Sequence, residues 1–450
     1  MLFRKLEKTI EDYLITNSNK VLLVDGARQV GKTYLIRYLG KKIFKNYIEI
    51  NMVEDDLNNH FFKNVSSVDD FYLQLSMIAG NKMGNLKNTL VFLDEIQVYP
   101  QLISLLKFLR QDNRFKYIAS GSLLGVTLKS TSSIPIGSIE ILHMYPLDFE
   151  EFLIANSFGK NAVEALQNKF KNLESLPENI HLKVMDLFKK YLLVGGLPDV
   201  VNTFLATKNI VSVRKYQNDI HSFYGADASK YEESRKLRIS RIYDAIPSNL
   251  ENKKKRIVAN KIEDKKGSRL SDYADEFDYL INSGIALEVK AISTPTFPLI
   301  QNSGKNLLKL YLNDVGILTG ILYKNNIRAV LDDEKSINLG SVYESVVASE
   351  LKAHGFNLYY YDNRNNGEVD FLVDDFDSLS VIPIEIKSGK DYQIHSALNK
   401  FTSNKDYNIK KAYVFSNERE IKQKDKITYL PIYYIMFIYP DSLSRVTQIP

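Results

Sequence analysis

The 450 residues of this chain predict roughly three domains, at about 150 residues for each. Hydrophobic residues make up 44% and charged residues 25%, which are ordinary globular values. No apolar run approaches the roughly 20 residues that a membrane-spanning helix needs, so we expect no membrane span. The chain has no cysteine, which excludes disulfides and thiolate metal sites and favours the cytoplasm. The formal net charge of +5 is unevenly spread along the chain.

The segment 26–33, which reads GARQVGKT, fits the phosphate-loop pattern G-x-x-x-x-G-K-[ST] at every required position. Apolar residues at 21–25 predict a buried strand before it, and residues 34–39 continue with helical spacing. We expect the loop N–H groups and the helix N-terminus to bind phosphates, with Lys32 on the β/γ oxygens and the Thr33 hydroxyl on Mg²⁺. The predicted nucleotide-binding residues are Gly26, Ala27, Arg28, Gln29, Val30, Gly31, Lys32 and Thr33.

A second apolar strand, predicted over 89–93, ends in two carboxylates. We expect Asp94 to hold magnesium, directly or through water, and Glu95 to polarise the attacking water. Both residue types are common at strand ends. Behind a complete phosphate loop, however, they favour a catalytic interpretation, and the sequence predicts ATP and Mg²⁺ as the ligands of this region.

The next predicted strand, 115–119, delivers Ser120 and Ser122 to the same edge of the sheet, where a polar side chain can sense the γ-phosphate. The alternative is that this Ser-Gly-Ser segment is only a turn. Arg110 and Arg114, just before the strand, are candidates for a finger supplied to a neighbouring subunit. A solvent-exposed helix end with favourable dipole placement is the preferred interpretation of both arginines.

The middle of the chain carries the basic character. The segment 230–270 holds thirteen Lys or Arg and six Asp or Glu, which leaves the rest of the chain near neutral. Apolar spacing predicts a helix over 239–246 ended by Pro247, a second over 272–281, and a wing strand over 285–289. This order suggests a winged helix-turn-helix that contacts nucleic-acid phosphates; a subunit contact or a solvated surface is the alternative. The expected phosphate contacts are Lys253, Lys254, Lys255, Arg256, Lys265, Lys266 and Arg269.

The C-terminal part contains an acid on one predicted strand, Asp370, and a Glu-x-Lys pair on the next, Glu385 and Lys387. Period-two alternation puts Glu385 and Lys387 on one strand face, where Asp370 can share a magnesium with Glu385. Glu344, on a predicted helix, can complete the ligand set, and Lys387 can orient water or stabilise the phosphate. This arrangement resembles the PD-(D/E)xK nuclease-like fold. An ordinary cross-strand ion network is the alternative.

Several motifs together resemble a prokaryotic AAA-type ATPase family whose members carry a C-terminal domain of unknown function. They are the phosphate loop, the LDEIQ strand end at 93–97, ASGS at 119–122, MYPLDFEEF at 144–152, GGLP at 195–198 and YLNDVG at 311–316. The resemblance implies that 26–33, Asp94 and Glu95 form the nucleotide site, and that the protein forms a homo-oligomer. One departure is visible: Pro135 to Ser138 stand where the family often has a Gly-Arg pair.

These observations predict an α/β multidomain protein. The expected parts are a P-loop ASCE/AAA-type domain with helices on both faces of a parallel sheet (1–155), a helical lid or linker (156–235), a winged-helix-like basic module (236–297) and a PD-(D/E)xK nuclease-like domain (298–450). The expected function is Mg-ATP hydrolysis coupled to DNA or another nucleic acid. The alternatives are a nucleotide-controlled switch or assembly protein whose nuclease-like domain binds without cleaving, and an ATP-gated metal-dependent nuclease.

Overall fold

The structure is a computed structural model, and it describes residues 2–122, 124, 137–227, 233–302, 307–332, 337, 339–389 and 392–440. Pro135 and Ile136, which stand where the family often has a Gly-Arg pair, lie outside these ranges, as does Lys230 of the basic segment. The chain divides into two compact units, Met1–Pro146 with Asp278–Ile285, and Leu147–Phe277 with Ala286–Pro450. No helix within the described ranges is both long and apolar enough to span a bilayer.

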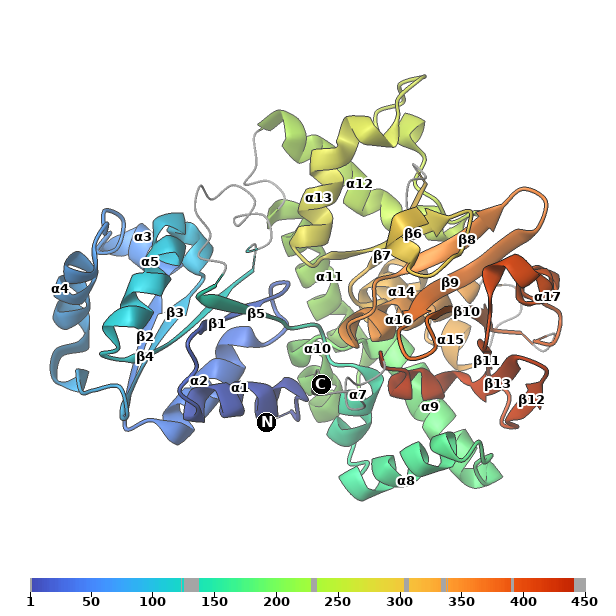
Figure 1. Ribbon diagram of the computed structural model, residues 1–450, viewed down its shortest axis with the longest axis horizontal. Helices are drawn as coiled ribbons and strands as arrows, with labels where there is room; N and C mark the ends of the chain where they lie inside the picture. The colour runs from blue at the N-terminus through green and yellow to red at the C-terminus, as the bar shows by residue number, and fades with distance from the viewer. Residues whose placement is uncertain are drawn as a thin grey trace, which may run out of the picture. The chain divides into compact units, whose positions relative to one another are not determined.

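The first unit is built on a five-stranded parallel sheet with the order β2-β3-β4-β1-β5 (Figure 1). β4 stands between β1, which leads into the phosphate loop, and β3, which leads into Glu95. Because all strands are parallel, their carboxyl ends meet at one edge, where ligands of open α/β sheets bind. The strands are β1 (Val21–Asp25), β2 (Asn46–Asn51), β3 (Thr89–Asp94), β4 (Lys116–Gly121) and β5 (Ile139–His143).

Helices cover both faces of this sheet, as the prediction of an α/β domain requires. Val91 of β3 shares a buried core with Phe71 and Leu106 from the helices of one face. Leu90, its neighbour along the strand, lies on the opposite face beside Gly40. The helical segments are α1 (Leu6–Ile15), α2 (Lys32–Ile43), α3 (Met52–Asn58), α4 (Val68–Ala79), η1 (Gly80–Lys82), η2 (Ile96–Val98) and α5 (Pro100–Asp112).

Helices dominate the N-terminal half of the second unit. They are α7 (Phe149–Ala155), α8 (Lys160–Lys171), α9 (Glu178–Val194), α10 (Pro198–Thr207), α11 (Ile210–Asp227), α12 (Glu233–Glu251), η4 (Ala259–Lys261), η5 (Leu270–Tyr273) and α13 (Ala274–Asn282), whose last turns belong to the first unit. The predicted stop at Pro247 is wrong, because α12 continues through this proline. Proline removes a helical hydrogen bond, but burial of Ile246 and Leu250 on one face holds the last turn.

The C-terminal half contains an eight-stranded mixed sheet with the order β12-β13-β11-β10-β9-β8-β6-β7. Its strands are β6 (Ala286–Ile292), β7 (Leu308–Leu312), β8 (Tyr359–Asn363), β9 (Gly367–Asp375), β10 (Ser380–Lys387), β11 (Ala412–Ser416), β12 (Lys422–Lys424) and β13 (Ile427–Pro431). The remaining helical segments are η6 (Leu299–Asn302), α14 (Val315–Tyr323), α15 (Arg328–Leu331), α16 (Gly340–Ala353), α17 (Ser396–Ser403), η7 (Lys405–Tyr407) and η8 (Ile432–Phe437). α16 packs against β10, and α17 packs against β9.

The predicted wing strand is the main correction to the expected architecture. β6 pairs antiparallel with β7 and parallel with β8, so it is a strand of the large sheet and not the wing of a small module. Local apolar spacing predicted a strand here, at about the right residues. Its partners are distant in the chain, and strand pairing with distant partners leaves no local signal.

The Gly-Gly-Leu-Pro turn connects α9 to α10 and meets the YLNDVG motif. The buried carboxylate of Asp314 accepts the Gly196 N–H at 2.7 Å and, as N-cap of α14, the Ile317 N–H at 3.0 Å. Gly195 has φ +73° and ψ −164°, a region that glycine alone adopts readily. A Cβ on Gly196 would lie 2.0 Å from the Leu147 carbonyl oxygen. Both glycines are therefore required by close packing.

Candidate functional site

The phosphate loop joins β1 to α2 in the first unit. Gly26 has φ +145°, and a Cβ there would lie 2.2 Å from the carbonyl oxygen of Met144, which follows β5. Gln29 and Gly31 also adopt positive φ, at 66° and 96°, so the loop curls before Gly31 caps α2. This curl directs successive backbone N–H groups and the helix N-terminus to one place, which is how such loops bind phosphate.

Lys32 is folded back over this loop. Its ammonium donates to the carbonyl oxygens of Gly26 and Ala27, each at 2.8 Å. Burial lowers the pKa of Lys32, while the charges of Glu95, Asp25 and Asp94 oppose that shift. The loop thus carries a buried cation among its own carbonyl groups, and a phosphate is the kind of ligand that can draw it away.

Thr33 and Asp94 lie together at the carboxyl edge of the sheet. The Thr33 hydroxyl donates to Asp94 Oδ2 at 2.9 Å, and Ser120 donates a short hydrogen bond to Asp94 Oδ1. Burial raises the pKa of Asp94; Ser120 opposes this shift and Glu95 adds to it. A hydroxyl and a carboxylate are ligands that suit magnesium, and a cation here would relieve the cost of ionising Asp94. The residues therefore fit the predicted ion.

Glu95 follows Asp94 with φ +55°, so its side chain leaves the strand in a different direction. Ser122 donates to Glu95 Oε2 at 2.8 Å, and Gln97 donates to the same oxygen at 2.5 Å. Arg28 of the phosphate loop donates to the Ser122 hydroxyl at 3.4 Å. The structure therefore brings the predicted Glu95 and Ser122 together and adds Gln97, which the sequence had marked only as part of a motif.

Arg4 was missed by sequence reasoning. It is buried, and its guanidinium donates to the Val30 carbonyl of the phosphate loop at 2.9 Å and to the Tyr145 carbonyl at 2.6 Å. Nothing in its sequence surroundings marks it, because both partners are backbone atoms far along the chain. The two finger candidates are bonded within the first unit: Arg110 donates to the Ser18 carbonyl at 2.7 Å, and Arg114 lies over the Tyr72 ring at 4.3 Å.

In the second unit, the four residues predicted as a nuclease-like site gather at the sheet. Asp370 is on β9, Glu385 and Lys387 are on β10, and Glu344 is on α16. Lys387 pairs with Glu385 Oε1 at 2.8 Å, and Asp370 Oδ2 accepts the Ile386 N–H at 2.8 Å. Burial and the charges of Glu385 and Glu344 raise the pKa of Asp370 well above its usual range. The cluster thus brings carboxyl groups together in a buried place, which favours the protonated form of Asp370.

Three residues that sequence reasoning did not assign to this cluster complete it. Lys255, from the loop after α12, forms an ion pair with Glu344, and Tyr311 donates to the other Glu344 oxygen at 3.0 Å. The fully buried Lys309 pairs with Glu368 at 2.6 Å. Burial disfavours the ionised form of Glu344, but Lys255 and Lys309 outweigh it and lower the pKa of Glu344. Lysine charges therefore balance much of the acidic charge.

The fit of this cluster to magnesium is partial. Carboxylate oxygens suit the ion, and Glu385 Oε2 is buried without a hydrogen bond from any described residue. Among the described residues, however, no three acidic or histidine side chains are arranged as a metal-binding group. Both carboxylate oxygens of Glu344 already accept hydrogen bonds, one from Lys255 and the other from Tyr311.

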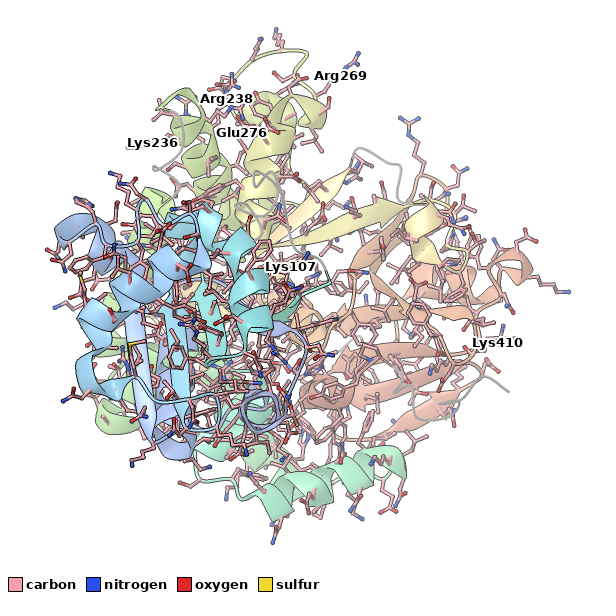
Figure 2. All side chains as sticks on the ribbon, turned by 60° about the vertical axis from the view of Figure 1, so that its left-hand side comes forward. Lys107, Lys236, Arg238, Arg269, Glu276 and Lys410 are labelled. Atoms are coloured by element: carbon pink, nitrogen blue, oxygen red, sulfur yellow. The ribbon has the colours of Figure 1, made fainter. Side chains whose placement is uncertain are left out.

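The basic segment separates into exposed and internally paired residues. Arg238 lies between Glu263, at 2.9 Å, and Glu276 of α13, at 3.7 Å. Arg256 pairs with Asp362 at 3.2 Å. Figure 2 shows Arg238 and Glu276 on neighbouring helices, with Arg269 at the outer end of the same segment. The exposed cations of the loops are Lys253, Lys254, Lys261, Lys265, Lys266 and Arg269. A pocket of about 660 Å³ is lined by six cations, Lys253, Lys254, Lys255, Arg256, Lys261 and Arg269.

Comparison with known families assigns three parts of the chain. Residues 18–153 match the family model of an AAA domain. Residues 185–327 match a domain of unknown function (DUF8612), and residues 339–435 match another (DUF4143). The match to the AAA domain covers the parallel sheet, the phosphate loop, Asp94 and Glu95.

The chain is similar to the uncharacterized protein MJ1544 of Methanocaldococcus jannaschii, with 27% identity over 82% of this chain and 75% of that protein. Among solved structures, the Walker-type ATPase PABY2304 of Pyrococcus abyssi is 17% identical with a TM-score of 0.43, covering 71% of this chain and 95% of that one. The Aeropyrum pernix ORC1 protein, solved in complex with DNA, is 12% identical with a TM-score of 0.32, covering 73% and 94%. The family match and the site agree: residues 18–153 match an AAA domain, and the phosphate loop, Asp94 and Glu95 all lie within the matched residues.

Proposed function

We propose that this chain hydrolyses Mg-ATP and couples hydrolysis to nucleic acid. The observation that carries the first part is the contact of Thr33 with Asp94 at the end of the phosphate loop, with Glu95 next to it. A phosphate-binding loop, a hydroxyl and carboxylate pair that fits magnesium, and an adjacent carboxylate that can accept a proton are the parts that ATP hydrolysis needs.

Each residue of the site has a distinct task in this proposal. Thr33 and Asp94 would hold magnesium, which when bound neutralises charge on the phosphates. Lys32 exchanges its two loop carbonyls for the β/γ oxygens of ATP. Ser120 keeps Asp94 oriented through its hydrogen bond. Glu95 accepts a proton from the attacking water at Oε1, while Ser122 and Gln97 hold its Oε2.

The nucleic-acid part of the proposal is supported by the loops of the basic segment. Lys253, Lys254, Lys265, Lys266 and Arg269 are exposed, which suits contacts to phosphates and gives no base specificity. A homo-oligomer and a cytoplasmic location are further parts of the proposal, taken from the family resemblance and from the absence of cysteine.

A second candidate function concerns the DUF4143 region, which we propose has the PD-(D/E)xK nuclease-like fold. The gathering of Glu344, Asp370, Glu385 and Lys387 supports an ATP-gated, metal-dependent nuclease. The ion pair of Lys255 with Glu344 instead favours the alternative, a nucleotide-controlled switch that binds its target without cutting it.

Magnesium-dependent ATP hydrolysis by the purified protein, with and without duplex DNA, tests the proposal. We expect hydrolysis that DNA stimulates and that Lys32→Ala abolishes. Stimulation would then justify a cleavage assay, in which Asp370→Asn separates the nuclease from the switch. Hydrolysis that DNA does not change would refute the nucleic-acid part, and hydrolysis that survives in Lys32→Ala would refute the site.

A further inference from the structure

Three stretches of chain form the basic pocket of the second unit. They are the loop 252–261, residues 268–270, and Leu307 before β7. The loop is fixed to the large sheet, because the Ile257 N–H donates to the Leu308 carbonyl of β7 at 3.0 Å. The pocket has a volume of about 660 Å³, within the roughly 300–1,000 Å³ of small-molecule sites. It is therefore a built feature of the fold that can hold a ligand the size of one nucleotide.

The charge of this pocket is positive and only partly balanced. Of its six cations, Lys255 pairs with Glu344 and Arg256 pairs with Asp362. Among the described residues, no acidic side chain lines the pocket. A hollow lined by one sign of charge focuses its electric field and attracts ions of the opposite sign. The positive charge comes from the four exposed cations, which are Lys253, Lys254, Lys261 and Arg269.

The rest of the lining carries no charge. Its polar members, Asn252, Asn260 and Ser268, can donate hydrogen bonds to a ligand. Apolar surface beside a few polar groups is typical of sites that bind organic molecules, and a bare inorganic anion would leave that surface in water. The lining thus suits an anionic group attached to a larger uncharged one. The apolar members are Ile257, Val258, Ala259, Leu270 and Leu307.

The shape and charge favour a phosphate at the end of a strand over one inside it. A phosphodiester inside a strand carries one negative charge, whereas a terminal phosphate monoester carries about −1.5 to −2 at pH 7 and presents three acceptor oxygens. A strand end can also enter a hollow, while a strand interior continues on both sides. Lys265 and Lys266 are exposed but do not line the pocket, so they remain available for phosphates along the strand.

We propose that the basic pocket binds the terminal phosphate monoester of a nucleotide. Lys254 and Lys261 contact the phosphate oxygens, and the apolar lining covers the sugar and base. A phosphorylated strand end and a free mononucleotide both carry this group. For the strand end, the inference rests on the proposed nucleic-acid binding, and it narrows the ligand to nucleic acid with phosphorylated ends.

Fluorescence anisotropy of the full chain with two short DNA duplexes tests the pocket. The duplexes have one sequence, and their ends carry either phosphate or hydroxyl groups. We expect phosphorylated ends to raise the affinity about tenfold or more, which is the worth of one charge-assisted hydrogen bond. Lys254→Ala/Lys261→Ala changes two exposed lysines, so it should fold, as circular dichroism checks, and should lose this gain. A gain that survives in this double variant would overturn the pocket.

Lys265→Ala is the matched control, because Lys265 is exposed on the same segment but does not line the pocket. It should weaken binding of both duplexes equally and keep the gain from phosphorylated ends. Loss of the gain in Lys265→Ala as well would show a general charge effect and would overturn the pocket.

Calorimetric titration with thymidine monophosphate distinguishes the free nucleotide from the strand end. Binding that is lost in Lys254→Ala/Lys261→Ala, without any gain from phosphorylated duplex ends, supports the pocket as a site for free nucleotides. Equal affinities for the two duplexes together with no binding of thymidine monophosphate overturn the pocket and leave the proposed nucleic-acid binding intact. Failure of both duplexes to bind overturns the nucleic-acid binding, and the titration with thymidine monophosphate then decides the pocket by itself.

Discussion

Replacing Gly195 by alanine should destabilise the second unit strongly. The residue has φ +73° and ψ −164°, and holding a non-glycine residue there costs on the order of 1–3 kcal/mol. The added Cβ would lie 2.1 Å from Asp314 Oδ1 and would displace that carboxylate. Asp314 would then lose at least one N–H bond to a charged acceptor, worth about 1.5–3 kcal/mol. The expected total is about 2.5–6 kcal/mol, a large part of the roughly 5–15 kcal/mol that stabilises a typical domain.

Gly225→Ala is the matched control for this substitution. Gly225 lies in α11, and an added Cβ there meets nothing within 4 Å. Alanine in a helix interior should stabilise by about 0.5–1 kcal/mol relative to glycine. Denaturant unfolding of the full chain, followed by circular dichroism, compares the two variants. A Gly195→Ala midpoint equal to that of wild type would refute the role assigned to the turn.

Three further results are expected. Arg4→Ala removes a hydrogen bond to the phosphate loop, and ATP binding measured by calorimetry should weaken about tenfold, whereas exposed Lys8→Ala should leave it unchanged. Burial raises the pKa of Asp314 to about 6, so the folded chain holds this proton more tightly than the unfolded chain. Its contribution to the unfolding free energy should fall by about 3 kcal/mol as pH rises from about 3 to about 7. The difference between wild type and Asp314→Asn in denaturant titrations should show this fall, and a difference independent of pH would contradict it. Lys254→Ala should reduce the slope of the log DNA-binding constant against log salt concentration by about one in magnitude. The control Lys410→Ala, at an exposed lysine on another part of the second unit, should leave this slope unchanged. Equal slopes in the two variants would argue against the basic loop as the DNA surface.

The sequence predicted the strands and the helix around the phosphate loop well, because their signals are local. The strand, loop and helix around 21–39 follow one another directly, and the LDEIQ motif marks the second strand end. Parallel strands share an edge, so the meeting of Thr33 with Asp94 follows from the fold class. The contact of Arg4 with the phosphate loop could not be predicted, because its partners are backbone carbonyl groups, which every residue has.

The second unit was harder to predict because its decisive contacts join residues that are far apart in the sequence. The pattern of Asp370, Glu385 and Lys387 is local to a strand pair, and the structure has these residues together. Lys255 was expected to face nucleic acid from a winged-helix module, but its side chain is only 15% exposed and pairs with Glu344. A run of lysines has the same composition whether its members face solvent or a buried acid. Only the fold of the loop distinguishes them.

The role of Glu95 as the proton acceptor is tested by single-turnover hydrolysis of Mg-ATP by wild type and Glu95→Gln, with ATP affinity measured on the same samples. Glutamine keeps the size of the side chain but cannot accept the proton. We expect ATP affinities that are equal within about threefold and hydrolysis that is slower by about 10²–10⁴ in the variant. Equal hydrolysis rates in the two proteins would contradict the assignment of Glu95, and with it the proposed mechanism.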